Sequence, residues 1–144
     1  SELPVQQLPM ALKEVRKTER QGEWIAEFLL ESFDVFGFSE NYTFASASSY
    51  GSVWFAGFRA VVKSAWARIE AAARGEDKPL VAVLGSALGE QCLFAVSLGM
   101  RCVGYELLCN STVLPARAIV AEHGLQDHIE FQCADAAEAQ GLEA

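Results

Sequence analysis

An apolar run that leads directly into a glycine turn constrains the fold of this chain more than any other feature. The run extends from Val81 to Leu84, and the turn that follows has the sequence Gly-Ser-Ala-Leu-Gly, from Gly85 to Gly89. An uninterrupted apolar run is typical of a strand that is buried on both faces of a parallel sheet. A turn of small residues after such a strand commonly opens a helix, and its backbone N–H groups can surround an anionic or polar ligand. The segment therefore predicts the first strand, turn and helix of an α/β domain.

The segments that follow continue the alternation of helix and strand. The pattern predicts a helix over 88–98, a strand over 102–105, a second helix over 112–123 and a third strand over 129–133. Gly99 and Gly124 follow the two helices, where glycine commonly ends a helix. Pro115 fits only the first turn of the second helix, which leaves 107–110 as a loop. The fold class is therefore α/β, with a Rossmann-like parallel sheet of three strands and flanking helices.

The residues before this alternation predict a separate N-terminal region. Residues 1–78 form a helical region with an aromatic loop, and residues 79–144 form the partial Rossmann-like domain. Helical spacing of apolar residues extends over 10–33, and the segment 37–52 has no sustained period, which is typical of a loop. Apolar residues at helical spacing then predict one helix that faces the core and ends near Gly75. These residues are Trp54, Phe58, Val61, Ala65 and Ile69.

Length and charge narrow the classes of function. A chain of 144 residues with 51% hydrophobic positions suits one domain, because typical domains have about 100–150 residues. The net charge of −8 argues against a nucleic-acid partner, because binding to phosphates depends mainly on Lys and Arg. The most apolar window, 53–62, is much shorter than the roughly 20 residues that span a bilayer. We expect neither nucleic acid nor a membrane as partner.

The cysteines and histidines do not predict a metal site. The four cysteines are Cys92, Cys102, Cys109 and Cys133, and none forms a Cys-x-x-Cys pair. We expect reduced, mostly buried thiols in an intracellular, reducing compartment. The two histidines flank the turn before the third strand, with no other ligand at a suitable spacing, so we expect them at the surface.

Two acidic residues mark the ends of the second and third predicted strands. Glu106 lies 21 residues after Gly85, close to the spacing of about 20 for a ribose-binding acid, and Asp135 follows the third strand. The carboxyl ends of parallel strands lie at one edge of the sheet, where α/β proteins bind ligands. The glycine turn and the two acids therefore predict a site for a nucleoside cofactor, although either acid could instead cap a helix.

Residues 80–137 resemble the class I S-adenosylmethionine-dependent methyltransferases. The glycine turn matches the first motif of that family as G-x-A-x-G, and Glu106 stands where the family has its ribose-binding acid. The most specific match lies in the second helix, the turn after it and the third strand: residues 116–117, 124–131 and 134–136. The resemblance implies S-adenosylmethionine as cofactor and a methyl acceptor that is a small molecule or a protein. Tyr50-Gly51 resembles the non-SET histone-lysine methyltransferases, and that resemblance would imply a protein acceptor.

The resemblance also implies a role for each residue of the predicted site. Four residues of the glycine turn would line the methionine and ribose, Glu106 would accept both ribose hydroxyls, and Leu107 would pack on the adenine. Asp135 and the backbone N–H of Ala136 would contact the edge of the adenine. The implied cofactor-binding set is Gly85, Ser86, Ala87, Gly89, Glu106, Leu107, Asp135 and Ala136. No catalytic residue is implied.

Methyltransferases of this class have a seven-stranded sheet in which the first strand is central, with the second and third on one side. The resemblance therefore implies that this chain supplies three strands of an incomplete sheet, and that the catalytic segment of the family lies beyond Ala144. The first strand would have an open edge, and open edges tend to pair with other strands. We expect this edge to be covered by further sequence, a partner chain, a second copy or the N-terminal helices.

Two alternatives remain open at this stage. Binding of a nicotinamide dinucleotide is less favoured, because the G-x-G-x-x-G pattern is absent and Cys92 stands at the third glycine position. The second alternative is a catalytically inert subunit that senses a cofactor or has a structural role.

Overall fold

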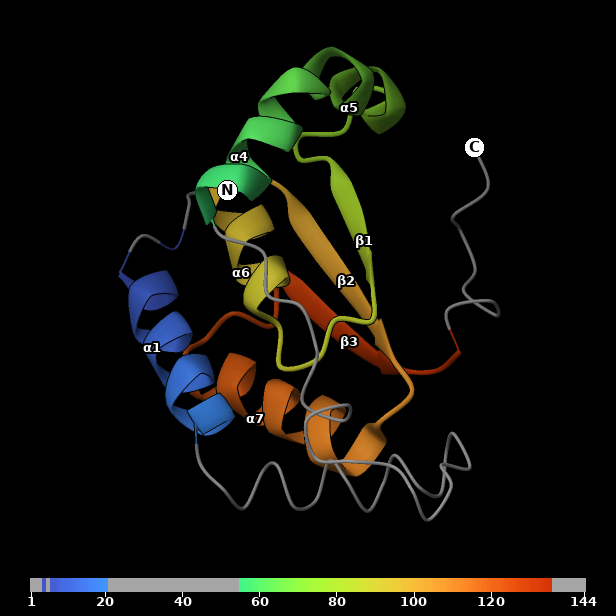
Figure 1. The fold of residues 1–144 in the computed structure, drawn as a ribbon. Coiled ribbons are helices and arrows are strands. Elements are labelled where there is room, and N and C mark those ends of the chain that lie inside the picture. The colour runs from blue at the N-terminus through green and yellow to red at the C-terminus, as the bar shows by residue number, and fades with distance from the viewer. Residues whose placement is uncertain (1–3, 5, 21–54, 136–144) are drawn as a thin grey trace.

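The computed structural model describes residues 4, 6–20 and 55–135, which form an α/β unit around one parallel sheet (Figure 1). Three described helices precede the first strand in the chain, and the helices that follow alternate with the strands. In chain order the elements are α1 (Gln7–Arg20), α4 (Phe55–Ser64), α5 (Trp66–Ala73), β1 (Leu80–Leu84), α6 (Glu90–Ser97), β2 (Arg101–Glu106), the π-helix η1 (Cys109–Val113), α7 (Leu114–Glu122) and β3 (Ile129–Cys133).

The three strands lie in the order β1-β2-β3, and both neighbouring pairs are parallel. Val83 lies opposite Gly104, and Gly104 lies opposite Phe131, so these three residues form a row across the sheet. The order confirms the prediction that the second and third strands lie on one side of the first. It also places the carboxyl ends of all three strands at one edge.

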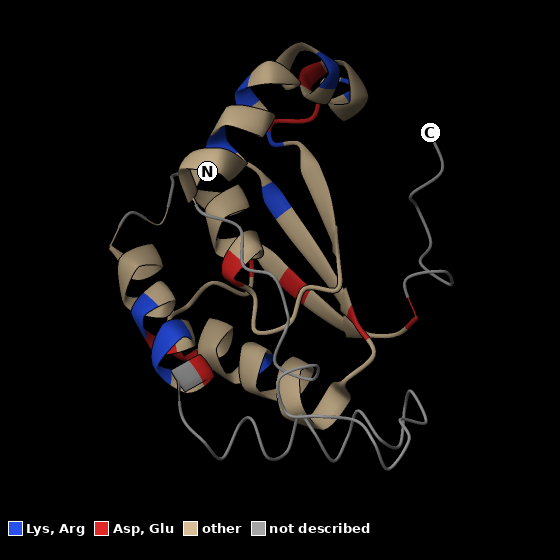
Figure 2. Cartoon of the chain, viewed as in Figure 1, with Lys and Arg blue, Asp and Glu red and all other residues tan. Residues whose placement is uncertain are grey.

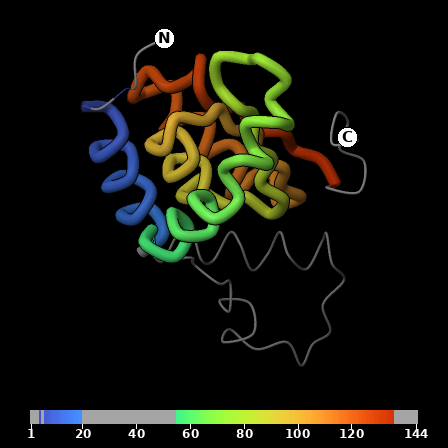
Figure 3. The backbone as a smooth tube through the Cα atoms, turned by 90° about the horizontal axis from the view of Figure 1, so that it is seen from above, coloured from blue at the N-terminus to red at the C-terminus, as the bar shows by residue number. Residues whose placement is uncertain are grey.

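Helices cover one face of this sheet. Helix α6 lies against all three strands, α7 lies against β3, and α1 packs on α6 and α7 as an outer layer (Figures 1 and 3). Val83, Cys102 and Phe131 are buried on this face. On the opposite face, Leu80 and Leu84 of β1 are more than half exposed.

Helix α1 confirms the first part of the predicted helical segment 10–33. Its buried residues Leu8, Ala11 and Val15 recur at helical spacing, so a single face of the helix packs on the core. Arg16 pairs with Glu90 at 3.6 Å and so links α1 to the first residue of α6. The remainder of that segment and the predicted loop 37–52 lie outside the described residues.

The prediction of one helix with a core-facing stripe after the loop is partly wrong. The structure has two helices that are separated at Ala65, and Val61 is 68% exposed. The side chains that pack against the core are Phe58, Val62, Trp66 and Ile69. Contact between the rings of Phe58 and Phe94, with centroids 5.8 Å apart, fixes the rotation of α4. Val62 lies one turn after Phe58 on the same face, whereas Val61 points elsewhere.

The loop predicted over 107–110 is shorter than expected, because η1 begins at Cys109. The N–H groups of Thr112 and Val113 both donate to the carbonyl of Leu108, at 3.1 and 3.2 Å. The helix predicted from residue 112 begins instead at Leu114. Pro115 lies in the first turn of α7, as predicted.

The expectation of reduced cysteines holds for one pair and is wrong for the other. Cys92 and Cys102 are free and buried, whereas Cys109 and Cys133 form a disulfide. The register of β2 and β3 places Cys133 opposite Glu106, and η1 brings Cys109 back toward that position. The Cα atoms of the two cysteines are 5.4 Å apart, within the range that a disulfide requires.

The buried thiol of Cys92 should make stability depend on alkaline pH. Burial raises the pKa of Cys92 well above its usual value, and the neighbouring Cys102 raises it further. Above about pH 8.5 the thiol of the unfolded chain loses its proton while the folded one keeps it, so stability falls as pH rises. We expect the urea midpoint to fall less steeply between neutral and alkaline pH in Cys92→Ala than in the wild type. Equal slopes in the two proteins would contradict this prediction.

Candidate functional site

Backbone hydrogen bonds bring the three predicted site segments together at the carboxyl edge of the sheet. The N–H groups of Gly85 and Ser86 donate to the carbonyl of Tyr105, at 2.8 and 3.2 Å. The N–H of Ala134 donates to the carbonyl of Glu106 at 3.1 Å. The glycine turn is thus attached to the end of β2, and the segment that leads to Asp135 is attached beside it. This edge is where open α/β sheets bind their ligands.

The glycine turn lies so close to the sheet that two positions admit only glycine. Gly89 has φ of +98°, and a Cβ there would lie 2.5 Å from the ring of Phe131. A Cβ on Gly104 would lie 2.5 Å from Oγ of Ser86 and 2.8 Å from the ring of Phe131. The ring of Phe131 therefore packs against the turn at Gly89. The missing side chain at Gly104 leaves room for Ser86 and for the ring of Phe131.

Ala87 has the backbone conformation that glycine adopts most readily. Its φ is +48°, its side chain is buried, and its N–H donates to Oε1 of Glu106 at 3.3 Å. A non-glycine residue in this region costs on the order of 1 kcal/mol or more, which the surrounding contacts must offset. Alanine therefore keeps the shape of the turn.

Glu106 is held between the glycine turn and the loop after β2. Its Oε1 accepts from the N–H of Ala87, and its Oε2 accepts from the N–H of Leu108 at 3.0 Å. A carboxylate has about four acceptor sites, so each oxygen can accept one further hydrogen bond. Two adjacent hydroxyls of a ribose are suitable donors. Because both oxygens are already oriented by the backbone, little side-chain freedom is lost when such a ligand binds.

The side chain of Ser86 lies differently from the expected ligand contact. Its Oγ is buried over Gly104 and has no hydrogen-bond partner in the part of the chain that the structure describes. The hydroxyl thus packs against β2 beneath the turn. The Ser86 hydroxyl is therefore not placed as the expected ligand contact, and the Ser86 N–H and C=O are hydrogen-bonded to Tyr105 and Gly89.

The remaining predicted residues lie around the same edge. Leu107 is half-buried directly after Glu106, Asp135 is exposed, and Ala136 lies outside the described residues. Sequence reasoning missed the disulfide that connects these segments. Cys109 comes three residues after Glu106 and Cys133 two residues before Asp135. The available signal was that each cysteine lies at or just after the end of one of two strands predicted to be neighbours, although the pairing itself depends on the register of these strands.

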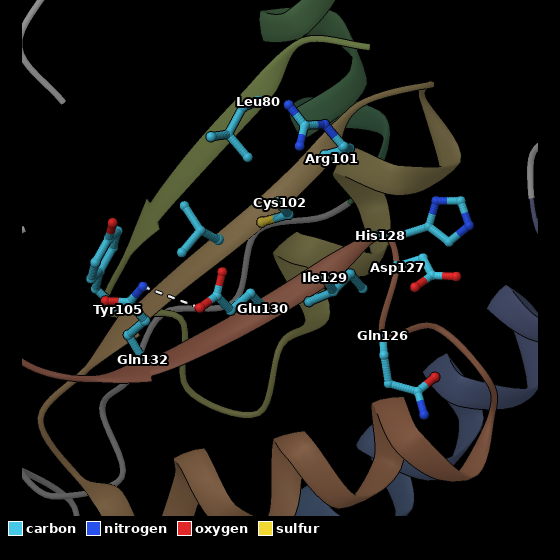
Figure 4. A pocket seen from close by; sticks show the side chains of 11 residues that line it. Leu80, Arg101, Cys102, Tyr105, Gln126, Asp127, His128, Ile129, Glu130 and Gln132 are labelled. Atoms are coloured by element: carbon cyan, nitrogen blue, oxygen red, sulfur yellow. Dashed lines mark hydrogen bonds between the residues drawn. The ribbon is translucent and has the colours of Figure 1, made fainter. Parts of the chain in front are cut away.

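A hollow of the described surface lies elsewhere, on the sheet face opposite α6 (Figure 4). Its volume is about 300 Å³, and its lining includes Leu80, Arg101 and His128 near the amino ends of the strands. Burial and the charge of Lys78 lower the pKa of His128. Neither the glycine turn nor Glu106 lines this hollow. We therefore place the candidate site at the carboxyl edge, where the oriented polar groups are.

Metal ligands do not gather in the described residues, where no three His, Cys, Asp or Glu side chains could hold an ion. His123 and His128 are both half-buried, so the expectation of surface histidines is wrong in part. Both lie at the turn before β3, at the end of the sheet away from Glu106.

Comparisons with family models, with curated proteins and with solved structures found no match for this chain. Among the described helices, none is both long and apolar enough to cross a bilayer. Acidic residues stand at the carboxyl end of β2 and just after β3 (Figure 2).

Proposed function

We propose that the chain binds S-adenosylmethionine at the carboxyl edge of its sheet and is the cofactor-binding part of a methyltransferase. The observation that carries this proposal is the position of Glu106, whose two oxygens accept N–H groups from both sides of the edge. A carboxylate oriented in this way, beside a turn of small residues, suits a ribose with two free hydroxyls. The parallel strand order β1-β2-β3 further supports the proposal.

Each segment of the edge has a separate task in this proposal. The backbone of Gly85, Ser86, Ala87 and Gly89 lines the methionine and ribose. Glu106 accepts the ribose hydroxyls, Leu107 packs on the adenine, and Asp135 with the N–H of Ala136 binds the adenine edge. The methyl acceptor is a protein or a small molecule, and we assign no catalytic residue to the described part of the chain.

A second candidate function uses the same site without methyl transfer. The chain would then be a cofactor-sensing or structural subunit, and the observation that favours it is the edge of β1 with which no other described strand pairs. Incubation with methyl-labelled S-adenosylmethionine and candidate acceptors separates the two functions. Transfer of label supports the enzyme, whereas tight cofactor binding with no transfer to any acceptor supports the subunit.

Substitution of Glu106 tests the proposed site directly. We expect Glu106→Ala to weaken binding of S-adenosylhomocysteine by about 10- to 100-fold, because charge-assisted hydrogen bonds contribute about 1.5–3 kcal/mol. Asp135→Ala should cost less, because the adenine keeps its contact with the backbone of Ala136. Isothermal titration calorimetry on the full chain measures both effects.

Glu130→Ala is the matched control for this experiment. Glu130 is an exposed acidic residue on β3. Its substitution by alanine removes one negative charge from the same sheet, as Glu106→Ala does, and leaves the glycine turn unchanged. Its affinity should equal that of the wild type. If Glu106→Ala also bound like the wild type, with its circular dichroism unchanged, Glu106 would not be a ribose ligand.

A further inference from the structure

The disulfide between Cys109 and Cys133 joins two segments that both hold Glu106. Leu108, the residue before Cys109, donates its N–H to Oε2 of Glu106 at 3.0 Å. Ala134, the residue after Cys133, donates its N–H to the carbonyl of Glu106 at 3.1 Å. The disulfide is thus a covalent link between the residue next to a donor to the Glu106 side chain and the residue next to a donor to the Glu106 backbone.

The other hydrogen bonds of Leu108 lie within η1. Its carbonyl accepts from the N–H groups of Thr112 and Val113, at 3.1 and 3.2 Å. These bonds fix the shape of the turn, whereas the disulfide ties the turn to the end of β3, which lies beside it (Figure 1). Unbonded sulfur atoms cannot lie at the roughly 2 Å of a bonded pair, so after reduction the two ends must separate. The N–H of Leu108 then moves away from the Glu106 carboxylate.

This movement is local, because helix α7 is attached to β3 separately. The guanidinium of Arg117 donates two hydrogen bonds to the carbonyl of Phe131, at 2.8 and 3.0 Å. Val113 and Ala116, on either side of the start of α7, are fully buried in the core. We therefore expect the reduced chain to keep its sheet and α7, with the change confined to residues 107–109.

A reductant can reach the bond from the Cys133 side. Cys133 is exposed, whereas Cys109 is half-buried. A thiolate of a dithiol attacks Sγ of Cys133, the S–S bond breaks, and Cys109 leaves as a thiolate that takes up a proton. The second thiol of the dithiol then displaces Cys133 and closes the disulfide of the reductant. The chain gains two electrons and two protons, which the dithiol loses.

We propose that the Cys109–Cys133 disulfide positions the carboxylate of Glu106 and is a redox switch of the candidate site. Reduction by a dithiol releases the carboxylate and weakens binding of the cofactor. The positioning of Glu106 does not depend on the ligand, whereas the effect on affinity rests on the proposed function. A side chain that must be ordered again on binding lowers affinity, so we expect S-adenosylhomocysteine to bind the reduced chain about 10-fold more weakly.

Calorimetric titration of S-adenosylhomocysteine into the full chain, oxidised and reduced with dithiothreitol, tests the effect on affinity. The same pair of titrations on Glu106→Ala distinguishes positioning from general stabilisation. Reduction should weaken binding about 10-fold in the wild type and leave the affinity of Glu106→Ala unchanged. Equal affinities of the two wild-type states, or the same loss in both proteins, would overturn the proposal.

The double variant Cys109→Ser with Cys133→Ser is the control for the reductant. It should bind S-adenosylhomocysteine as weakly as the reduced wild type, with or without dithiothreitol. An affinity equal to that of the oxidised wild type would show that the covalent link does not position Glu106. If this variant did not fold, the titrations of the wild type and Glu106→Ala would decide the question without it.

Nuclear magnetic resonance of the ligand-free chain separates failure of this proposal from failure of the proposed function. An amide proton resonates at lower field when it is bonded to a carboxylate. Reduction should therefore move the Leu108 amide proton upfield in the wild type and much less in Glu106→Ala, where that acceptor is already missing. If the chain bound no S-adenosylhomocysteine in either state, this difference would still support the positioning of Glu106, and only the proposed cofactor would be wrong. Equal movements in the two proteins would overturn the proposal whichever ligand binds.

Discussion

Reduction of the Cys109–Cys133 disulfide is expected to lower the free energy of unfolding by about 3 kcal/mol. The two cysteines are 24 residues apart, and a disulfide that closes a loop of that length reduces the entropy of the unfolded chain by about this amount. Urea denaturation with and without dithiothreitol measures the difference. Cys133 is exposed, so the reductant can reach the bond without prior unfolding.

The control for this prediction is the double variant Cys109→Ser with Cys133→Ser. It should be as unstable as the reduced wild type and should not respond to dithiothreitol. Thiol titration gives an independent check, because the unfolded, unreduced chain should expose only the thiols of Cys92 and Cys102. If all four cysteines titrated before reduction, and stability did not change with dithiothreitol, the prediction would fail.

Phe131→Ala is expected to lower the free energy of unfolding by about 3–5 kcal/mol, the largest effect of any substitution considered. The ring is 4% exposed, and its removal leaves a cavity that the surrounding side chains fill only in part. The same ring fills the space beneath Gly89 and beside Gly104, so its loss also removes the support of the glycine turn. The urea midpoint and its slope measure the change.

Two variants on β3 serve as controls for this substitution. Phe131→Leu keeps most of the apolar volume, so it should cost clearly less than alanine. Glu130→Ala changes an exposed neighbour and should shift stability by no more than about 0.5 kcal/mol. Equal effects of alanine at the two positions would show that Phe131 is not a supporting residue of the core.

The strands and helices after residue 79 could be predicted from the sequence because each is bounded by a clear local signal. The apolar run of β1 ends before Gly85, and Gly99 lies two residues after the end of α6. The parallel pairing was also predicted, from the alternation of strands and helices, whereas the strand order was implied only by the family resemblance. Local sequence therefore sufficed for the three strands and for α6, whereas η1 and the start of α7 were not predicted.

The features that sequence reasoning missed depend on contacts between distant residues. The rotation of α4 is set by Phe94, so Val62 faces the core instead of Val61. The disulfide depends on the register of β2 and β3 together with the turn of η1. Neither constraint is visible in a local pattern, because each joins segments that the chain separates.

The same distinction applies to the candidate site. The position of Glu106 at the end of β2 was predicted from its spacing to Gly85. The two N–H groups that hold its carboxylate come from Ala87 and Leu108, and only the structure shows them. The inward position of the Ser86 hydroxyl follows from the absence of a side chain at Gly104, another contact between distant residues.

Calorimetric titration of the unmodified chain with S-adenosylhomocysteine and, separately, with a nicotinamide dinucleotide tests the central claim most directly. Both ligands contain an adenosine unit, so the comparison asks which cofactor the edge formed by the glycine turn, Glu106 and Asp135 accepts. We predict saturable heat with S-adenosylhomocysteine and none with the dinucleotide. Heat with the dinucleotide, and none with S-adenosylmethionine or S-adenosylhomocysteine at millimolar concentration, would contradict the account.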